Sequence, residues 1–412
     1  MNSFQEKLPE IDILRIISIM IVVLMIHIPN NYAYNFYVEL SGHTGLLVHT
    51  LGIYVAMGSF TFISGFGLFL HSKNRNINSG ERLITFLKKR FFRIFPLYWV
   101  ALIIFLIIYE YYSALNFFYL LSHFVGLQII LAPMYSPPIW TMWFIGLIII
   151  YYLIFIILSY LGSLKKIIPA SLIILFIFFI LHNNFGLVEN RFFIYYLPFI
   201  GGIIAANIYT SPHIKEIREV LNKQHPLGIP IIVSCCMIIC WIIYPYITEY
   251  YFSTFISTYG TIYLSSILSG NISISEFFDT IVLVNMIILF FIIFVLSLSY
   301  LIFRALSLVC SQNKLFNIVS IVAYSTFSVY LFHRPFFETF NEIMSEIFHI
   351  NMYLKSSFNL TLLSIPLLFV LAFMIQKVAD KGVNKVDVKL NDILKLKTSE
   401  GVPQVENDII KE

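Results

Sequence analysis

The chain has 412 residues, of which 59% are hydrophobic and 12% are charged, and its mean hydropathy is +0.86. Long apolar runs recur along the whole chain, so this composition excludes an ordinary soluble domain and predicts an all-α polytopic membrane protein. The net charge of +4 gives no sign of nucleic-acid binding. The four cysteines have no metal-ligand partners at useful spacing, and we expect no metal site.

The first apolar run, residues 12–28, contains two ionisable side chains, Arg15 and His27. In a helix they lie roughly 18 Å apart along the axis, which is over half of the hydrocarbon thickness. Ionisable groups inside a membrane are costly and usually functional, so both residues are candidates for a site. The alternative is that Arg15 extends to the headgroups and His27 sits in the opposite interface.

A second apolar run covers residues 46–70 and contains small residues that permit close helix packing, namely Gly58, Ser64, Gly65 and Gly67. It is followed by a strongly basic stretch, residues 71–93, which the positive-inside rule places in the cytoplasm. The first two helices then form a hairpin with the N-terminus inside. Arg15 falls at the inner end of its helix and His27 at the outer end.

The weaker apolar segment 117–133 decides the topology. If it crossed the membrane, Lys165 and Lys166 would lie outside, and every later loop would carry the wrong charge. We therefore expect it to dip into, or lie on, the outer face. This predicts about ten transmembrane helices with both termini cytoplasmic, near residues 12–28, 46–70, 90–108, 141–161, 168–181, 193–209, 228–247, 277–303, 315–333 and 356–376. Residues 8–378 form the predicted transmembrane domain, and residues 379–412 a flexible cytoplasmic tail.

Five short motifs lie in these segments. They are Asp12-x-x-Arg15 followed by His27, Phe62-Ile-Ser-Gly65, Lys89-Arg-Phe-Phe-Arg-Ile-Phe-Pro-Leu-Tyr98, Ile139-Trp-Thr-Met-Trp-Phe144 and Tyr330-Leu-Phe-His333. In this order and on these sides of the membrane, the motifs resemble those of the acyltransferase 3 family of integral membrane acyltransferases. The resemblance covers roughly residues 8 to 376.

The resemblance implies a multi-pass enzyme of the cell membrane that takes an acyl group from cytosolic acyl-CoA. Acetyl-CoA is the default donor, although succinyl or a longer acyl chain fits equally. The implied acceptor is a hydroxyl of a cell-surface glycan or its precursor, as in polysaccharide O-acetylation. Membrane lipids and a glycan or sugar-lipid acceptor are the expected partners, nucleic acid is not, and the oligomeric state stays open.

The chain departs from the family pattern in two ways. The family spacing between the arginine and the histidine is usually one residue shorter, so Arg15 and His27 would lie about 120° apart around a regular helix. A π-bulge, or a disrupted turn before Pro29, would absorb the extra residue. Many members also carry a glutamate shortly after the tryptophan motif, where this chain has Gly146-Leu-Ile-Ile-Ile150.

Acyl transfer from a thioester to a hydroxyl needs a base, donors for the oxyanion and a site that holds the acyl donor. A neutral imidazole suits the first role, which makes His27 the candidate base; acylation of His27 itself, as a relay, is the alternative. His333 is predicted at the outer end of its helix. It would orient the acceptor or donate to the oxyanion, or else it is only an interfacial histidine.

Arg90 and Arg93 lie three residues apart, on one face of a helix, and their guanidinium groups match the phosphates of coenzyme A. Lys89 would add positive charge, and Arg15 would either bind a donor phosphate or pair with Asp12. Plain positive-inside topology is the other explanation for the basic block.

Trp140, Trp143 and Tyr135, near the outer mouth, are candidates for stacking on a sugar ring, and an aromatic belt explains them equally well. The rival function is a glycan or lipid transporter or flippase without catalysis, but no transporter repeat is evident. A receptor or scaffold explains neither the buried histidine nor the Arg-x-x-Arg block.

Overall fold

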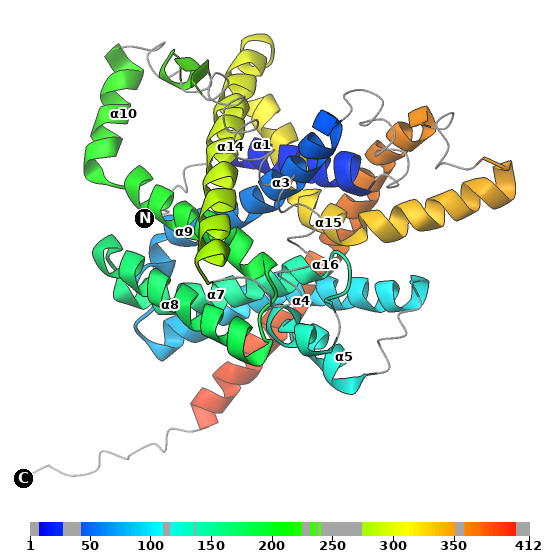
Figure 1. The fold of residues 1–412 in the computed structure, drawn as a ribbon, viewed down its shortest axis with the longest axis horizontal. Coiled ribbons are helices and arrows are strands. Elements are labelled where there is room, and N and C mark those ends of the chain that lie inside the picture. Colours follow the sequence, from blue (N-terminus) through cyan, green and yellow to red (C-terminus); the bar gives the residue numbers. More distant parts are fainter. Residues whose placement is uncertain are drawn as a thin grey trace, which may run out of the picture.

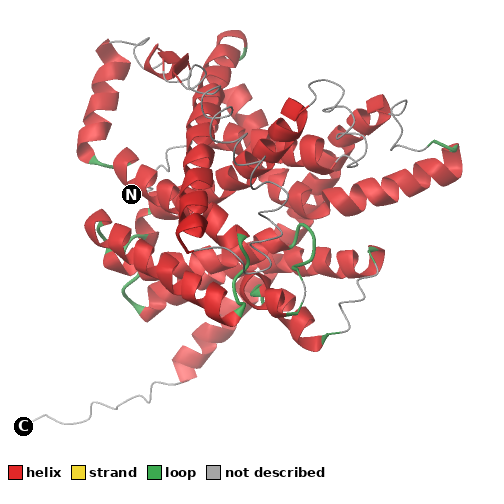
Figure 2. Cartoon of the chain, in the orientation of Figure 1, coloured by secondary structure: helices red, strands yellow, loops and turns green. Residues whose placement is uncertain are grey.

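A computed structural model describes residues 8–27, 43–109, 116–135, 137–224, 231–235, 238–239, 274–350 and 358–400. Within these ranges the regular elements are all helices (Figure 2). In chain order they are α1 Pro9–Ile21, the π-helix η1 Val22–His27, α3 His43–Leu70, the 3₁₀ turn η2 Ser72–Asn74, α4 Gly80–Ile108, α5 Phe117–Phe124, α6 Gln128–Leu131, the 3₁₀ turn η4 Ala132–Met134, α7 Trp143–Leu161, α8 Leu164–Phe185, α9 Arg191–Tyr209, α10 Pro212–Gln224, α14 Ile274–Val309, α15 Gln312–Phe348 and α16 Phe358–Glu400.

The protein is an integral membrane protein of apolar helices. Among the described residues, 8 helices are long and apolar enough to cross a membrane, and they coincide with eight of the ten predicted spans. The span predicted at 12–28 corresponds to α1 followed directly by η1. The span predicted at 228–247 lies largely outside the described residues.

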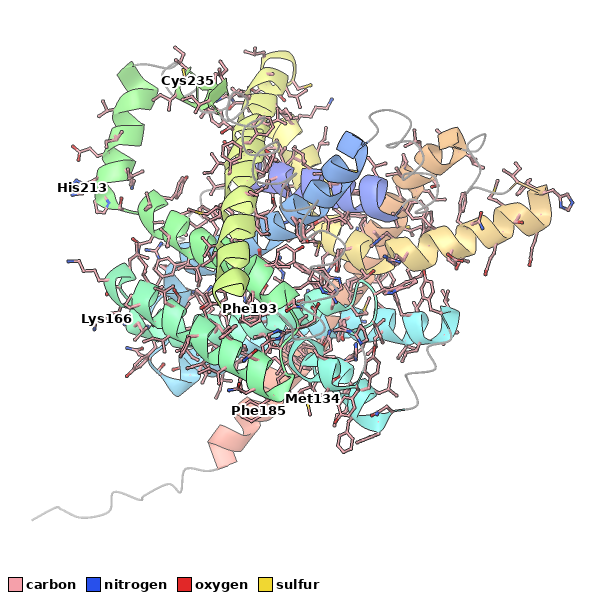
Figure 3. The ribbon with its side chains drawn as sticks, in the orientation of Figure 1. Met134, Lys166, Phe185, Phe193, His213 and Cys235 are labelled. Carbon is pink, nitrogen blue, oxygen red and sulfur yellow. The ribbon has the colours of Figure 1, made fainter. Side chains whose placement is uncertain are left out.

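The segments predicted to be cytoplasmic lie together at one end of the bundle. The backbone N–H of Asn76, in the basic loop, donates to the Ser159 carbonyl near the end of α7, at 3.1 Å. At the same end, Lys88 of α4 pairs with Asp387 of α16, with 2.6 Å between Nζ and Oδ1. Lys166 lies at the start of α8, directly after this end of α7 (Figure 3).

The segments predicted to be external lie at the opposite end. Phe185 lies at the end of α8 opposite to Lys166, and Met134 lies at the same end of the bundle as Phe185 (Figure 3). There the Val188 N–H donates to the Ile130 carbonyl at 3.0 Å. The two groups of loops are thus separated as the charge pattern predicts, while the side that faces the cytoplasm stays a prediction.

Helix α1 lies inside the bundle, in contact with α3, α14 and α15 (Figure 1). Ile13, Leu14, Ser18 and Ile19 are all buried. The Ser18 hydroxyl donates to the Leu14 carbonyl at 2.7 Å, so its polar atom is satisfied within the helix. The helix that carries Arg15 therefore contacts protein on several sides.

Helices α3 and α9 cross at very short distance, because glycine on each helix faces the backbone of the other. A Cβ atom at Gly65 would collide with the carbonyl oxygen of Phe199, and one at Gly202 would collide with the carbonyl oxygen of Phe62. Gly58 is equally tight against Ile288 of α14. The predicted close packing is therefore confirmed at Gly58 and Gly65. No atom lies within 4 Å of a Cβ built at Gly67.

The segment 117–133 forms short helices rather than one long helix, which agrees with the prediction that it does not cross the membrane. Helix α5 has 8 residues and α6 has 4, and even α5 is only about 12 Å long, far short of a hydrocarbon core. The chain reverses at Gly126, whose φ is +79°. A side chain there would collide with Ile149 of α7, which places the turn against the side of that helix. Residues 117–134 thus form a short helical hairpin that dips alongside α4 and α7.

Hydrogen bonds from α4 hold this hairpin. The Tyr98 hydroxyl donates to the His123 carbonyl at 2.7 Å, and Trp99 Nε1 donates to the Phe124 carbonyl at 2.9 Å. Gln128 Nε2 donates both to the Tyr98 hydroxyl, at 3.1 Å, and to the Met142 carbonyl, at 2.8 Å. These bonds satisfy polar groups that would otherwise be buried without partners.

The buried imidazole of His123 joins α5 to the chain that follows the hairpin. Its Nδ1–H donates to the Tyr119 carbonyl at 2.9 Å, and its Nε2 accepts from the Ile139 N–H at 3.1 Å. Only the neutral imidazole with its proton on Nδ1 satisfies both bonds. Burial lowers the pKa of His123 from 6.5 to about 4, and the bond to Tyr119 opposes this shift.

Helix α16 differs from the prediction for the C-terminal region. We expected a flexible tail from residue 379, but α16 continues to Glu400. The Tyr324 hydroxyl of α15 donates to Asp380 Oδ2, and Lys88 of α4 pairs with Asp387, so α16 contacts its neighbours beyond the predicted span. The boundary at residue 378 stays a prediction, and residues 401–412 lie outside the described part of the chain.

We predict that Gly65→Ala and Gly202→Ala each lower the thermal stability of the protein in detergent, because a methyl group has no space at the α3–α9 crossing. Overpacking of this kind costs about 1–3 kcal/mol or more. Gly67→Ala is the matched control, since it adds the same methyl group to α3 in open space. Equal melting temperatures for all three variants would contradict the crossing.

We predict that His123 makes the protein sensitive to acid. Its folded pKa lies below its unfolded value, so its contribution to stability is complete above pH 6.5 and is lost as the pH falls toward about 4. Thermal unfolding in detergent should therefore show a drop in that window for the parent. The drop should be smaller in His123→Gln, which starts less stable but cannot take the proton. Parallel curves for the two proteins would exclude this role.

Candidate functional site

Arg15 lies at the predicted inner end of α1 and forms an ion pair within its own helix. Its Nη1 donates to Asp12 Oδ1 at 3.0 Å, and the side chain is 28% exposed. The structure therefore shows the pairing that the sequence left open. Arg15 is also close enough to Arg93 of α4 and Tyr152 of α7 for electrostatic interaction. Arg15 thus has a carboxylate partner in its own helix and a second guanidinium group nearby.

Arg90 lies between two aromatic rings. The centre of its guanidinium is 5.4 Å from the ring centroid of Phe86, one turn earlier on α4, and 5.4 Å from that of Tyr152. Its Nε atom is buried and has no hydrogen-bond partner among the described residues. A guanidinium held by rings, with no carboxylate beside it, keeps its hydrogen-bonding capacity for an anion.

Arg93, three residues on, is exposed. Together Arg15, Arg90 and Arg93 form an arginine cluster contributed by α1 and α4, with Tyr152 of α7 between them. The structure thus brings together three of the predicted donor-binding residues. Sequence reasoning missed Tyr152, because one tyrosine in an aromatic-rich helix carries no distinguishing signal.

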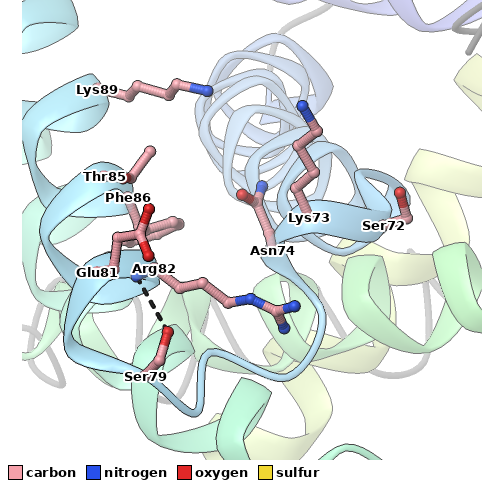
Figure 4. Close-up of a pocket in the computed structure, with 9 residues that line it drawn as sticks. All are labelled: Ser72, Lys73, Asn74, Ser79, Glu81, Arg82, Thr85, Phe86 and Lys89. Atoms are coloured by element: carbon pink, nitrogen blue, oxygen red, sulfur yellow. Dashed lines mark hydrogen bonds between the residues drawn. The ribbon is translucent and has the colours of Figure 1, made fainter. Parts of the chain in front are cut away.

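The two lysines before Arg90 differ in their surroundings. Lys88 is paired with Asp387, whereas Lys89 is exposed and lines a pocket beside α4 (Figure 4). Lys89 is therefore the one that contributes charge to a concave surface.

At the other end of α1, the π-helix η1 covers Val22–His27. A π-helical turn holds one residue more than an α-helical turn, so it absorbs the extra residue between Arg15 and His27. The angular offset then falls from about 120° to about 20°. This confirms the π-bulge that the spacing indicated. The π-helix contacts α3 and α15, and the side chain of His27 is not among those described.

His333 lies in α15 and is fully buried. Its Nδ1 is 2.8 Å from the Tyr330 carbonyl and 3.0 Å from the Val329 carbonyl, so Nδ1 carries a proton. In the neutral imidazole Nε2 then holds a lone pair. The neutral side chain is thereby suited to accept a proton or a hydrogen bond at Nε2. The prediction that His333 ends its helix is wrong, because α15 continues to Phe348. Its two predicted roles stay predictions.

The three predicted sugar-stacking residues differ in access. Trp140 is 57% exposed, with the guanidinium of Arg334 at 4.9 Å from its ring. Tyr135 is also exposed. Trp143 is covered instead, by the Arg191 guanidinium at 4.3 Å and by Tyr195, whose ring stacks on it at 5.8 Å. Trp143 therefore packs in the protein, and Trp140 and Tyr135 keep an accessible ring.

An ion pair beside Trp143 was not predicted. Arg191 Nε donates to both carboxylate oxygens of Glu189, each at 2.6 Å. The Glu189 N–H donates to the Ile129 carbonyl at 2.8 Å, which ties this pair to the hairpin. The partners are two residues apart, but nothing in the sequence shows that they lie against the tryptophan motif. Within the described ranges, no group of three or more His, Cys, Asp or Glu residues is placed to hold a metal ion.

The comparisons with known proteins gave one match. A family model described as an acyltransferase domain matches residues 8–375, which is most of the chain. No curated protein and no solved structure matched.

Proposed function

Because this chain belongs to the acyltransferase 3 family of membrane acyltransferases, we propose that it transfers an acyl group from cytosolic acyl-CoA to a glycan hydroxyl. Acetyl is the proposed acyl group, and a cell-surface polysaccharide or its precursor is the proposed acceptor. The protein would act in the plasma membrane, with the arginine cluster facing the cytoplasm.

The observation that carries this proposal is the state of Arg90. Its guanidinium lies between Phe86 and Tyr152, and its buried Nε has no hydrogen-bond partner among the described residues. Positive-inside topology alone requires a charge at this position, but not an aromatic enclosure for it. The pyrophosphate of coenzyme A supplies the acceptor oxygens that such a group lacks.

The reaction then uses both ends of α1. The acceptor hydroxyl oxygen bonds to the thioester carbonyl carbon while a base removes its proton. The carbon–sulfur bond breaks, the proton returns to the thiolate, and an ester and free coenzyme A remain. His27 is the proposed base. His333, with its lone pair on Nε2, would accept a hydrogen bond from the acceptor and orient it. Acylation of His27 as a relay stays the alternative.

We predict that Arg90→Ala or Arg93→Ala weakens coenzyme A binding to the purified protein. Loss of one charge-assisted phosphate contact costs about 1.5–3 kcal/mol, or roughly 10- to 150-fold in Kd. Isothermal titration would measure it. Lys165→Ala is the control, because it removes a cation from the same predicted face outside the arginine cluster. Unchanged affinity in both arginine variants would leave the block as a topology signal only.

We predict that His27→Gln abolishes acyl transfer while coenzyme A still binds. A general base contributes about 10²- to 10⁴-fold, and glutamine keeps the volume but cannot take the proton. Release of free thiol from acyl-CoA in the presence of acceptor measures turnover. A glutamine variant within about tenfold of the parent would exclude His27 as the base, and the role would pass to His333.

The π-helix offers a control for this prediction. Deletion of Val23 removes the one extra residue that the π-helical turn holds, while Val22 remains. The segment η1 can then become a regular α-helix, and His27 keeps its direction. This variant should keep activity. Insertion of an alanine at the same place should rotate His27 by about 100° and abolish it. Equal activity in the two variants would show that the helical phase does not matter.

A further inference from the structure

A pocket of about 470 Å³ lies between the turn η2 and the first turns of α4 (Figure 4). This volume falls in the range of small-molecule sites. Its lining includes three cations, Lys73, Arg82 and Lys89, together with the Ser79 hydroxyl and the ring of Phe86. We call it the α4 pocket. The proposed reaction assigns no role to this pocket.

The cations of the α4 pocket come from both of its walls. Lys73 extends from η2 and Lys89 from α4, and their ammonium groups point toward each other (Figure 4). In the described part of the chain, none of the three cations forms an ion pair, although Glu81 also lines the pocket. Like charges directed at one space repel unless an anion lies between them.

The η2 wall is held in place by hydrogen bonds to α3 and α7. Asn74 Nδ2 donates to the Leu68 carbonyl at 3.0 Å, and Arg75 Nε donates to the Phe69 carbonyl at 2.7 Å. The Asn76 N–H donates to the Ser159 carbonyl, and the Asn76 carbonyl accepts from Arg82 Nη1 at 3.1 Å. The turn that carries Lys73 is therefore built before any ligand arrives, as in most ligand sites.

The α4 pocket adjoins the arginine cluster. Phe86 lines the pocket, and its ring also lies against the Arg90 guanidinium. His71 lies near cations of both sets. Burial lowers its pKa, and Arg90, Lys89 and Lys73 lower the pKa further, so all three charges are near it. A single extended ligand can reach both sites.

We propose that the α4 pocket binds the 3′-phosphorylated nucleoside of coenzyme A, while Arg90 and Arg93 bind its pyrophosphate. This inference rests on the proposed function and adds a second anion site to it. Coenzyme A carries two separate anionic groups, and the chain presents two adjacent sets of cations. The 3′-phosphate would lie among Lys73, Arg82 and Lys89, the three cations that line the pocket. The proposal identifies Lys73 and Arg82 as residues that select coenzyme A over its dephosphorylated form.

The test compares coenzyme A with 3′-dephospho-coenzyme A by isothermal titration at low ionic strength. The parent should prefer coenzyme A by about tenfold or more, which is the effect of one or two charge-assisted contacts. In the double variant Lys73→Ala, Arg82→Ala the preference should fall to about twofold or less, with dephospho-coenzyme A binding unchanged. Arg90→Ala should weaken both ligands by the same factor. The charge-conserving pair Lys73→Arg, Arg82→Lys should keep the preference.

Each other result has a distinct meaning. If the double variant keeps the full preference while Arg90→Ala weakens both ligands, the proposed function stands and the α4 pocket assignment is wrong. The same result is expected if the pocket holds an anionic lipid headgroup, because the two ligands would then not differ there. If the parent binds neither ligand, both the proposed function and this inference fail.

Discussion

The structure depends on enclosing one apolar helix that carries an ion pair within protein, in an apolar medium. Helix α1 carries Asp12 and Arg15, and in contact with lipid alone this pair would be expensive. The chain meets this constraint by packing α1 against α3, α14 and α15 and by pairing Arg15 with Asp12 at 3.0 Å. The surrounding helices are therefore fixed by what they must cover.

Close backbone contacts make this enclosure rigid. At Gly65 and Gly202, each helix faces a backbone carbonyl group of the other with no side chain between them. This close contact leaves no freedom for α3 to slide along α9. The hairpin at 117–134 is fixed in another way, by hydrogen bonds to Tyr98 and through His123. The hydrogen bonds of the hairpin give partners to buried polar groups such as the Tyr98 hydroxyl, as an apolar medium requires.

The sequence carried enough information for the helices, the hairpin and the π-helix, because charge pattern and residue spacing encode them locally. It did not show the aromatic enclosure of Arg90, since Tyr152 joins α4 from a helix 62 positions later in the chain. The contact of Lys88 with Asp387 and the cover over Trp143 have the same origin. Each joins residues whose individual chemistry is ordinary and whose proximity depends on the whole fold.

The π-helix shows how strongly the angle between two side chains around a helix determines whether they can act in one site. A side chain sits about 5–6 Å from the helix axis, so an offset of about 120° moves an imidazole roughly 9 Å, whereas an offset of about 20° moves it roughly 2 Å. A misplacement of about 1 Å can already cost a hundredfold in rate. A separation of twelve positions from Arg15 to His27 is therefore compatible with a shared face only if one turn is widened. The widened turn begins at Val22, which is fully buried, and contacts α3 and α15. Packing against these helices, rather than intrinsic preference, then holds the backbone in the rarer form.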